Sequence, residues 1–132
     1  MNIGEAAQAT GLPAKTIRYY ESVGLIEPPA RSGGNYRRYG ERDLATLRFI
    51  QQARGLGFSV KEVAALVALW RDRGRASADV RRLASAHLVD IDRRIAELRR
   101  MRAGLQRLVE RCQGDHHPGC PIIDELAAEE VG

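Results

Sequence analysis

The sequence predicts a mainly α-helical protein in which an N-terminal helix-turn-helix with a β-hairpin wing precedes one long coiled-coil helix. Three observations support this fold class. Two short helical patterns, residues 3–10 and 13–22, are separated by Gly11 and Leu12, as in a helix-turn-helix. A turn-rich tip at residues 32–35 lies between short extended runs, which is typical of a hairpin. Within residues 77–112, apolar side chains recur every three or four positions from Ala84 onward, with a break only at Arg102, which is the period of a coiled-coil helix.

Composition and charge indicate a small globular protein with a basic body. The chain has 132 residues, 44% of them hydrophobic and 29% charged, enough for one ordinary domain or two very small ones. No apolar run approaches ~18 residues, so we expect no membrane partner and a cytoplasmic location. The net charge is +4, yet residues 112–132 contain acidic residues and no basic one. The basic excess of the remaining chain is compatible with a nucleic-acid partner.

The first two helices are delimited by specific residues. Asn2 and Glu5 form the pattern of a capping box, and Gly11 can end the first helix with a positive φ. Pro13 suits the first position of a second helix that runs to about Ser22. This second helix carries cations and aromatics, the side chains Lys15, Arg18, Tyr19 and Tyr20. They suit a phosphate-lined groove, and the alternative is a solvated helix face with two core aromatics.

The wing and two further helices follow. The return leg of the hairpin and its approach carry side chains suited to phosphate contacts, namely Arg31, Tyr36, Arg37 and Arg38. A third helix is predicted from Asp43 to about Arg54, before a glycine-rich break. Ser59 and Glu62 form a second capping box that opens a fourth helix. Its inward face is predicted to consist of Val63, Leu66, Val67 and Trp70.

The long helix predicts a homodimer. Its narrow apolar stripe comprises Ala84, Leu88, Ile91, Ile95, Leu98, Leu105 and Val109. A helix of roughly 50 Å cannot bury such a stripe in a small monomer, so a second copy is the expected partner. An intramolecular bundle is the alternative. We therefore predict three segments: a winged helix-turn-helix with a helical extension at 1–74, a dimerisation helix at 75–111, and a loop with a short helix at 112–132.

The terminal loop carries the two cysteines of the chain, Cys112 and Cys120. We expect both thiols to meet at its neck and to bind a metal, with free thiols or a reversible disulfide as alternatives. Cys120 precedes a short helix expected from Pro121 to about residue 128, whose N-terminus favours a thiolate, whereas Cys112 ends the long helix, which disfavours one. Two thiolates suit a soft monovalent ion. Zn(II) usually requires four ligands, a number that His116 and His117 would complete together with the two cysteines.

Several dispersed motifs resemble the MerR family of transcription regulators, without a gap from residue 1 to about 70. They are Thr16-Ile17-Arg18-Tyr19-Tyr20-Glu21, Gly24-Leu25, Asn35-Tyr36-Arg37 with Tyr39, and Gly57-Phe58-Ser59 with Glu62. The resemblance implies an antiparallel coiled-coil homodimer that binds double-stranded promoter DNA and activates RNA polymerase by untwisting an overlong promoter spacer. It implies DNA contacts by Arg18, Tyr20, Tyr36 and Arg37. The resemblance is weaker for Lys15, Tyr19, Arg31 and Arg38.

The terminal loop resembles one branch of that family. Cys112, seven intervening residues and Cys120-Pro121-Ile122-Ile123 are similar to the copper-efflux regulators of the CueR/HmrR type. This implies Cu(I) as effector, bound by Cys112 and Cys120, with Ag(I) or Au(I) as substitutes. It also implies that Ser77 stands where divalent-ion sensors carry a third cysteine, although Ser77 could simply cap the long helix.

Other functions fit the sequence less well. The nearest alternative is a sensor of Zn(II) or another divalent ion that uses His116 or His117. An organic-ligand sensor would need an effector domain, and a protein-held iron–sulfur cluster would need more cysteines. A small metal carrier would not need the helix-turn-helix. An enzyme is not expected, because the chain contains no catalytic motif.

Overall fold

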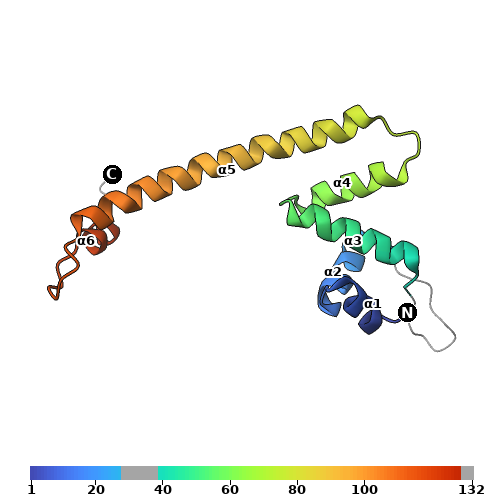
Figure 1. The fold of residues 1–132 in the computed structure, drawn as a ribbon, viewed down its shortest axis with the longest axis horizontal. Helices are drawn as coiled ribbons and strands as arrows, with labels where there is room; N and C mark the ends of the chain where they lie inside the picture. The colour runs from blue at the N-terminus through green and yellow to red at the C-terminus, as the bar shows by residue number, and fades with distance from the viewer. Residues whose placement is uncertain (28–38, 129–132) are drawn as a thin grey trace. The chain divides into compact units, whose positions relative to one another are not determined.

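The computed structural model describes residues 1–27 and 39–128, and within these ranges every regular element is a helix (Figure 1). The helices are α1 (Ile3–Thr10), α2 (Ala14–Ser22), α3 (Glu41–Gly55), α4 (Val60–Arg71), α5 (Ser77–Arg111) and α6 (Pro121–Ala127). The chain forms two compact units, Met1–Ala84 and Ser85–Gly132. The mainly α fold with a helix-turn-helix and a long C-terminal helix is therefore confirmed. The predicted hairpin, with Arg31, Tyr36, Arg37 and Arg38, lies outside the described residues.

Helices α1 and α2 form the helix-turn-helix of the first unit. The side chain of Asn2 accepts the backbone N–H of Glu5 at 2.8 Å, and the Glu5 carboxylate accepts the N–H of Asn2 at 3.2 Å, so the first capping box is confirmed. Gly11 ends α1 with a φ of 75°, a left-handed conformation that other residues rarely adopt. We had expected Pro13 to be the first helical residue of α2. It is instead the N-cap, because its ψ of 144° is extended.

Helices α3 and α4 complete the core of the first unit, in which they pack side by side (Figure 1). Helix α3 begins two residues earlier than predicted, since the Asp43 carboxylate accepts the N–H of Gly40 at 2.8 Å and fixes the first turn there. The predicted capping box of Ser59 and Glu62 opens α4. The largest fully buried side chains of the described residues are Ile17, Leu47, Ile50 and Val63. Each contributes about 1.5–3 kcal/mol through burial.

Tyr39, where the described part of the chain resumes, contacts the N-terminus before α1 and the side chain of Glu21 on α2. Tyr39 is only 2% exposed, and its hydroxyl donates to the carboxylate of Glu21 on α2. The N-terminal ammonium of Met1 donates to the carbonyl oxygen of Tyr39 at 2.9 Å. These contacts position the return of the chain after residue 38 against the start of α1 and the end of α2. We did not predict them, because they join residues far apart in the sequence.

Most of α5 belongs to the second unit, and most of its apolar stripe is exposed in the described chain. Along that stripe Ile95 is 41% exposed, Leu98 60%, Leu105 55% and Val109 54%. At 1.5 Å per residue, the 35 residues of α5 span about 52 Å. Ser77 is the first residue of the helix, as predicted. None of the helices among the described residues combines the length and the apolar character needed to cross a membrane.

Candidate DNA-binding surface and metal loop

Helix α2 presents three of the predicted contact residues to solvent. Lys15, Arg18 and Tyr19 follow the i, i+3, i+4 spacing of one helix face, and all three are exposed. Tyr19 is 50% exposed, whereas the next residue, Tyr20, is 6% exposed and belongs to the hydrophobic core. The two tyrosines therefore differ in role. Burial leaves Tyr20 little surface for a contact with DNA, and its main effect is to hold α2 against the core.

A shallow cavity of about 350 Å³ beside this face adds a basic residue that we did not predict. It is lined by Lys15, Thr16, Tyr19, Tyr20, Arg54 and Val60. The Arg54 guanidinium donates to the carbonyl oxygen of Phe58 at 2.7 Å, which holds the side chain across the turn between α3 and α4. Arg54 lies more than thirty residues from α2 in sequence, and the only sequence signal for it was its place at the end of a helix. The cavity brings it to α2 as a candidate phosphate contact.

The two cysteines meet at the neck of the terminal loop, as predicted. Cys112 follows the last residue of α5, and Cys120 is the N-cap of α6. Their Sγ atoms are 3.1 Å apart, and both residues are free cysteines. Gly114 turns the loop with a φ of 64°, and the carboxylate of Asp115 accepts the N–H of His117 at 2.9 Å. The loop thus closes on a pair of sulfur atoms between two helix ends.

The two thiols have shifted pKa values of opposite sign. The hydrogen bond between the sulfurs is the main cause, and it raises the pKa of Cys112 and lowers the pKa of Cys120. The backbone N–H groups of Ile123 and Ile122, at the start of α6, lower the pKa of Cys120 further. The predicted directions are confirmed. The predicted cause was incomplete, because the sulfur–sulfur contact outweighs the helix ends.

The histidines of the loop do not complete a larger ligand set. In the part of the chain that the structure describes, no His, Asp or Glu side chain joins the two cysteines in a group whose ligand atoms all lie within 4.8 Å. Both His116 and His117 are exposed. The donor set at the neck is therefore two sulfurs, which suits a soft ion with a low coordination number.

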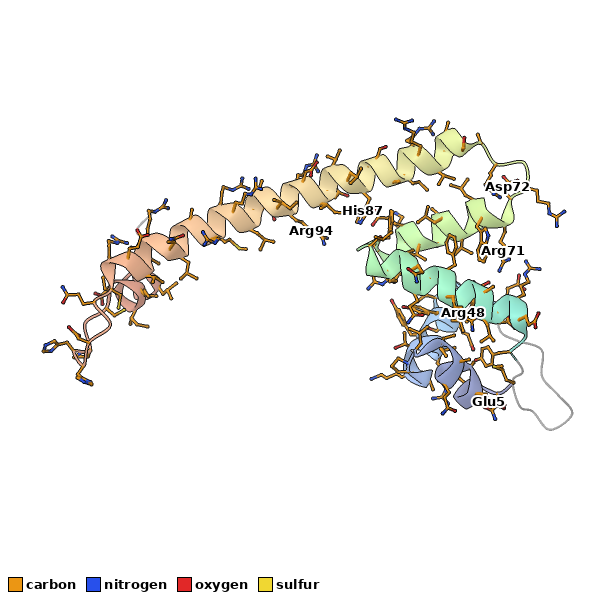
Figure 2. The ribbon with its side chains drawn as sticks, in the orientation of Figure 1. Glu5, Arg48, Arg71, Asp72, His87 and Arg94 are labelled. Carbon is orange, nitrogen blue, oxygen red and sulfur yellow. The ribbon has the colours of Figure 1, made fainter. Side chains whose placement is uncertain are left out.

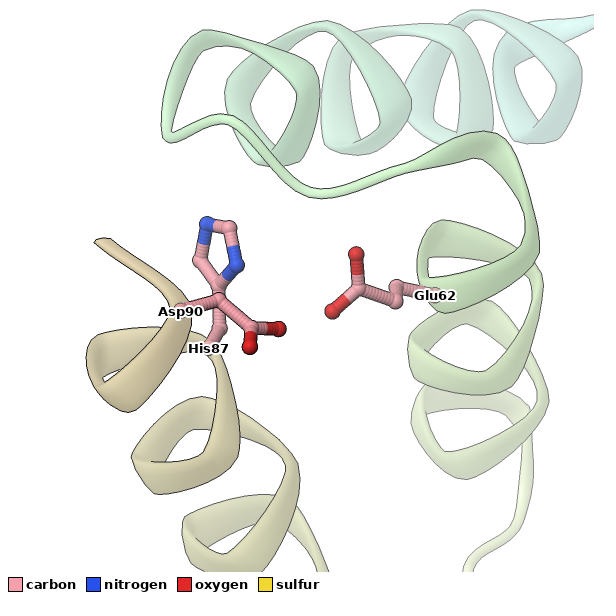
Figure 3. A group of neighbouring side chains, drawn as sticks. All are labelled: Glu62, His87 and Asp90. Atoms are coloured by element: carbon pink, nitrogen blue, oxygen red, sulfur yellow. The ribbon is translucent and has the colours of Figure 1, made fainter. Parts of the chain in front are cut away.

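Three other side chains of types that can bind metals are Glu62, His87 and Asp90 (Figure 3). Glu62 is on α4 in the first unit, where its carboxylate accepts the N–H of Ser59 at 2.8 Å and caps the helix. His87 and Asp90 are one turn apart on α5 in the second unit, and Asp90 forms an ion pair with Arg93 at 3.6 Å. His87 is buried. Each of the two carboxylates thus has a partner close to it in the sequence.

Curated relatives match nearly the whole chain. The regulator HmrR of Sinorhizobium medicae is 51% identical over 127 residues, which cover 96% of this chain and 86% of the relative. The heavy metal-dependent transcription regulator 2 of Rhizobium meliloti is 50% identical over 127 residues, with the same shares covered. Both are transcription regulators rather than enzymes.

The chain is also similar to a solved structure and matches two protein-family models. The transcription regulator PbrR691 from Ralstonia metallidurans, in complex with lead(II), superposes with a TM-score of 0.84 at 33% identity and covers 96% of this chain and 99% of its own. Residues 1–70 match the MerR HTH family regulatory proteins, and residues 44–108 match the family described as MerR, DNA binding. The chain therefore belongs to the MerR family of DNA-binding transcription regulators.

Proposed function

We propose that the chain is a homodimeric, metal-responsive activator of transcription whose effector is Cu(I), with Ag(I) and Au(I) as substitutes. The observation that carries the proposal is the pair of sulfurs of Cys112 and Cys120, 3.1 Å apart and without a third ligand among the described residues. Two thiolates satisfy a soft monovalent ion, because a linear S–metal–S site needs no further donor. The name of the Rhizobium meliloti relative, a heavy metal-dependent regulator, supports a metal effector.

Binding of the ion requires a change at the neck of the loop. Metal–sulfur bonds are about 2.3 Å long in zinc sites, and a linear site with bonds of similar length places its sulfurs about twice that distance apart. The sulfurs of Cys112 and Cys120 at 3.1 Å must therefore separate to admit an ion. Because they lie at the end of α5 and the start of α6, that separation moves the two helix ends. We infer that this movement is the signal that passes along the dimer to the DNA-binding units.

The resemblance to copper-efflux regulators extends the proposal to the promoter. We expect the dimer to bind double-stranded promoter DNA of copper-efflux genes and, with metal bound, to distort it so that RNA polymerase can start transcription. Contacts by Lys15, Arg18 and Tyr19 are supported by their exposure on one face of α2. Ser77, the first residue of α5, is the proposed determinant of selectivity against divalent ions.

A sensor of Zn(II) or another divalent ion is the second candidate. Two observations favour it: His116 and His117 lie between the cysteines, and PbrR691 is a related regulator seen with lead(II). This candidate requires the loop to refold, because the histidines are not grouped with the sulfurs. Their imidazoles would then supply the two further ligands that a tetrahedral ion needs.

An anaerobic competition experiment separates the two candidates. The reduced protein is titrated with Cu(I) and with Zn(II) against chelators of known affinity, and each metal is then added to transcription in vitro from the protein's own operator. We expect tight binding of Cu(I) that needs both cysteines, and transcription that responds to Cu(I) and Ag(I) but not to Zn(II). Zn(II)-dependent transcription that is lost in a His116→Ala/His117→Ala variant would establish the divalent sensor instead.

The pKa shifts of the two thiols predict that Cu(I) affinity rises with pH. The metal binds thiolates, so protons compete with it. Because the hydrogen bond to Cys120 raises the pKa of Cys112 above its ordinary value, this thiol must lose its proton on binding. Affinity should rise by at least about tenfold per pH unit between about pH 6 and pH 8. Chelator competition at several pH values measures this slope, and a flat profile would show that both cysteines are already ionised.

A further inference from the structure

Three arginines and an indole ring line one cavity where α3 begins and α4 ends. A cavity of about 480 Å³ is lined by Arg42, Trp70, Arg71 and Arg73, so that every charged group in its wall is a cation. The guanidinium of Arg71 lies 4.1 Å from the centre of the Trp70 ring. Arg71 is labelled on α4 in Figure 2. None of these residues belongs to the exposed face of α2 that carries Lys15, Arg18 and Tyr19. The fold described above gives no reason for three cations to lie together here.

Packing fixes the position of Arg71. The Trp70 ring stacks on Phe49, with 4.5 Å between ring centres and an angle of 4° between the planes. The guanidinium of Arg71 also donates to the hydroxyl of Thr46, which in turn donates to the carbonyl oxygen of Arg42 at 2.9 Å. A guanidinium held by an aromatic face and by a hydrogen bond loses less conformational freedom when it binds an anion. The arrangement is therefore prepared for a ligand.

The nearby carboxylates accept hydrogen bonds from backbone groups. Asp43 accepts the N–H of Gly40 at 2.8 Å, and Asp72 accepts the N–H of Gly74 at 2.9 Å. Among residues 1–27 and 39–128, none of the guanidinium groups of Arg42, Arg71 and Arg73 forms an ion pair with a carboxylate. The cavity thus lacks an internal anion, and an external one would be attracted to it.

The location of the arginine cavity indicates which anion fits. A neighbouring cavity of about 260 Å³ shares Arg42 and Arg71 and is otherwise lined by Gly24, Leu25, Ile26, Glu27, Asp43, Thr46 and Val67. Residues 24–27 lie directly before segment 28–38, and Arg42 follows shortly after it. The arginine cavity is therefore at the base of the segment that the sequence predicts to be the wing. Phosphates of the operator backbone are the anions that a DNA-contacting wing would bring to this end of the unit.

We propose that Arg42, Arg71 and Arg73 bind a phosphate of the operator backbone, next to the predicted wing and apart from the contacts of α2. The proposal rests on the DNA-binding function of the family. Arginine binds phosphate through paired hydrogen bonds, and such contacts fix the register of a protein on DNA without reading its sequence. An acidic surface of a partner protein is the other anion that could occupy the cavity, and the test separates the two.

The salt dependence of operator binding tests this site in the full-length dimer. An Arg42→Gln/Arg73→Gln variant removes two cations and leaves Arg71 on Trp70, so the core contacts of α4 stay intact. We expect it to weaken specific and non-specific DNA binding equally and to reduce the slope of log K against log salt by about 1 to 2, since each phosphate contact contributes about 0.9. Arg48→Gln is the matched control. Arg48 is exposed on α3, the helix that also carries Arg42, and it lines neither the arginine cavity nor the neighbouring one (Figure 2).

The possible outcomes are distinct. A slope that falls in the double variant but not in Arg48→Gln supports the phosphate site. An unchanged slope, or an equal fall in the control, overturns it. An unchanged slope with weaker transcription would overturn it in favour of a protein partner. An Arg18→Gln variant is measured in parallel: if it too binds DNA normally, the proposed recognition surface on α2 is wrong, independently of the arginine cavity.

Discussion

The Cys112→Ser and Cys120→Ser variants are each expected to retain operator binding and to lose metal-induced transcription, down to the level of the metal-free protein. A serine hydroxyl is a hard donor that stays protonated near neutral pH, so it cannot replace a thiolate on a soft ion. With two sulfurs as the donor set, the loss of either leaves one ligand. Fluorescence anisotropy with labelled operator measures DNA binding, and anaerobic transcription in vitro with added Cu(I) measures induction.

The His116→Ala/His117→Ala variant is the control within the same loop. Both imidazoles are exposed, and neither groups with the sulfurs, so Cu(I) induction should be unchanged. Either serine variant that keeps full induction would refute the site at Cys112 and Cys120. A histidine variant that loses Cu(I) induction would show that the site has more than two ligands. Operator binding in the absence of metal confirms that each variant is folded.

Local signals in the sequence were sufficient to predict the helices. The capping boxes at Asn2 and Ser59 each depend on two side chains three residues apart, so they form as soon as the first turn does. Gly11 ends α1 because of its own backbone freedom. The period of α5 persists over 35 residues, which leaves no other regular structure for it. The predicted starts of α2 and α3 were wrong by one and two residues. Helix α2 begins at Ala14 after the N-cap Pro13, and α3 begins at Glu41 after the N-cap Gly40.

Contacts between distant segments could not be predicted in this way. The difference between Tyr19, half exposed, and Tyr20, buried, depends on how α2 rotates against the core formed with α3 and α4. Arg54 reaches α2 only after the chain has folded around the core. The stack of Phe49, Trp70 and Arg71 joins two helices whose individual patterns show only that Trp70 faces inward. The loop at residues 112–120 was predictable because both cysteines lie at its ends.

The exposed stripe of α5 leads to the second large effect: a Leu98→Glu variant is expected to be monomeric and to lose operator binding. Leu98 is 60% exposed in the single chain, so a carboxylate costs the monomer little. In a homodimer the substitution removes two buried leucines, worth about 1.5–3 kcal/mol each, and buries two charges in their place. The dimer dissociation constant should rise by at least about a hundredfold.

Analytical ultracentrifugation of the variant measures its oligomeric state, and anisotropy with a full operator and with a half-site measures DNA binding. A monomer can still bind a half-site, so only the affinity for the full operator should collapse. Ala96→Glu is the matched control, because Ala96 is exposed on α5 and lies on the face opposite Leu98 at 100° per residue. If Leu98→Glu remains a dimer, the seam predicted from Ile95, Leu98 and Leu105 is not the interface, and another surface must join the two copies.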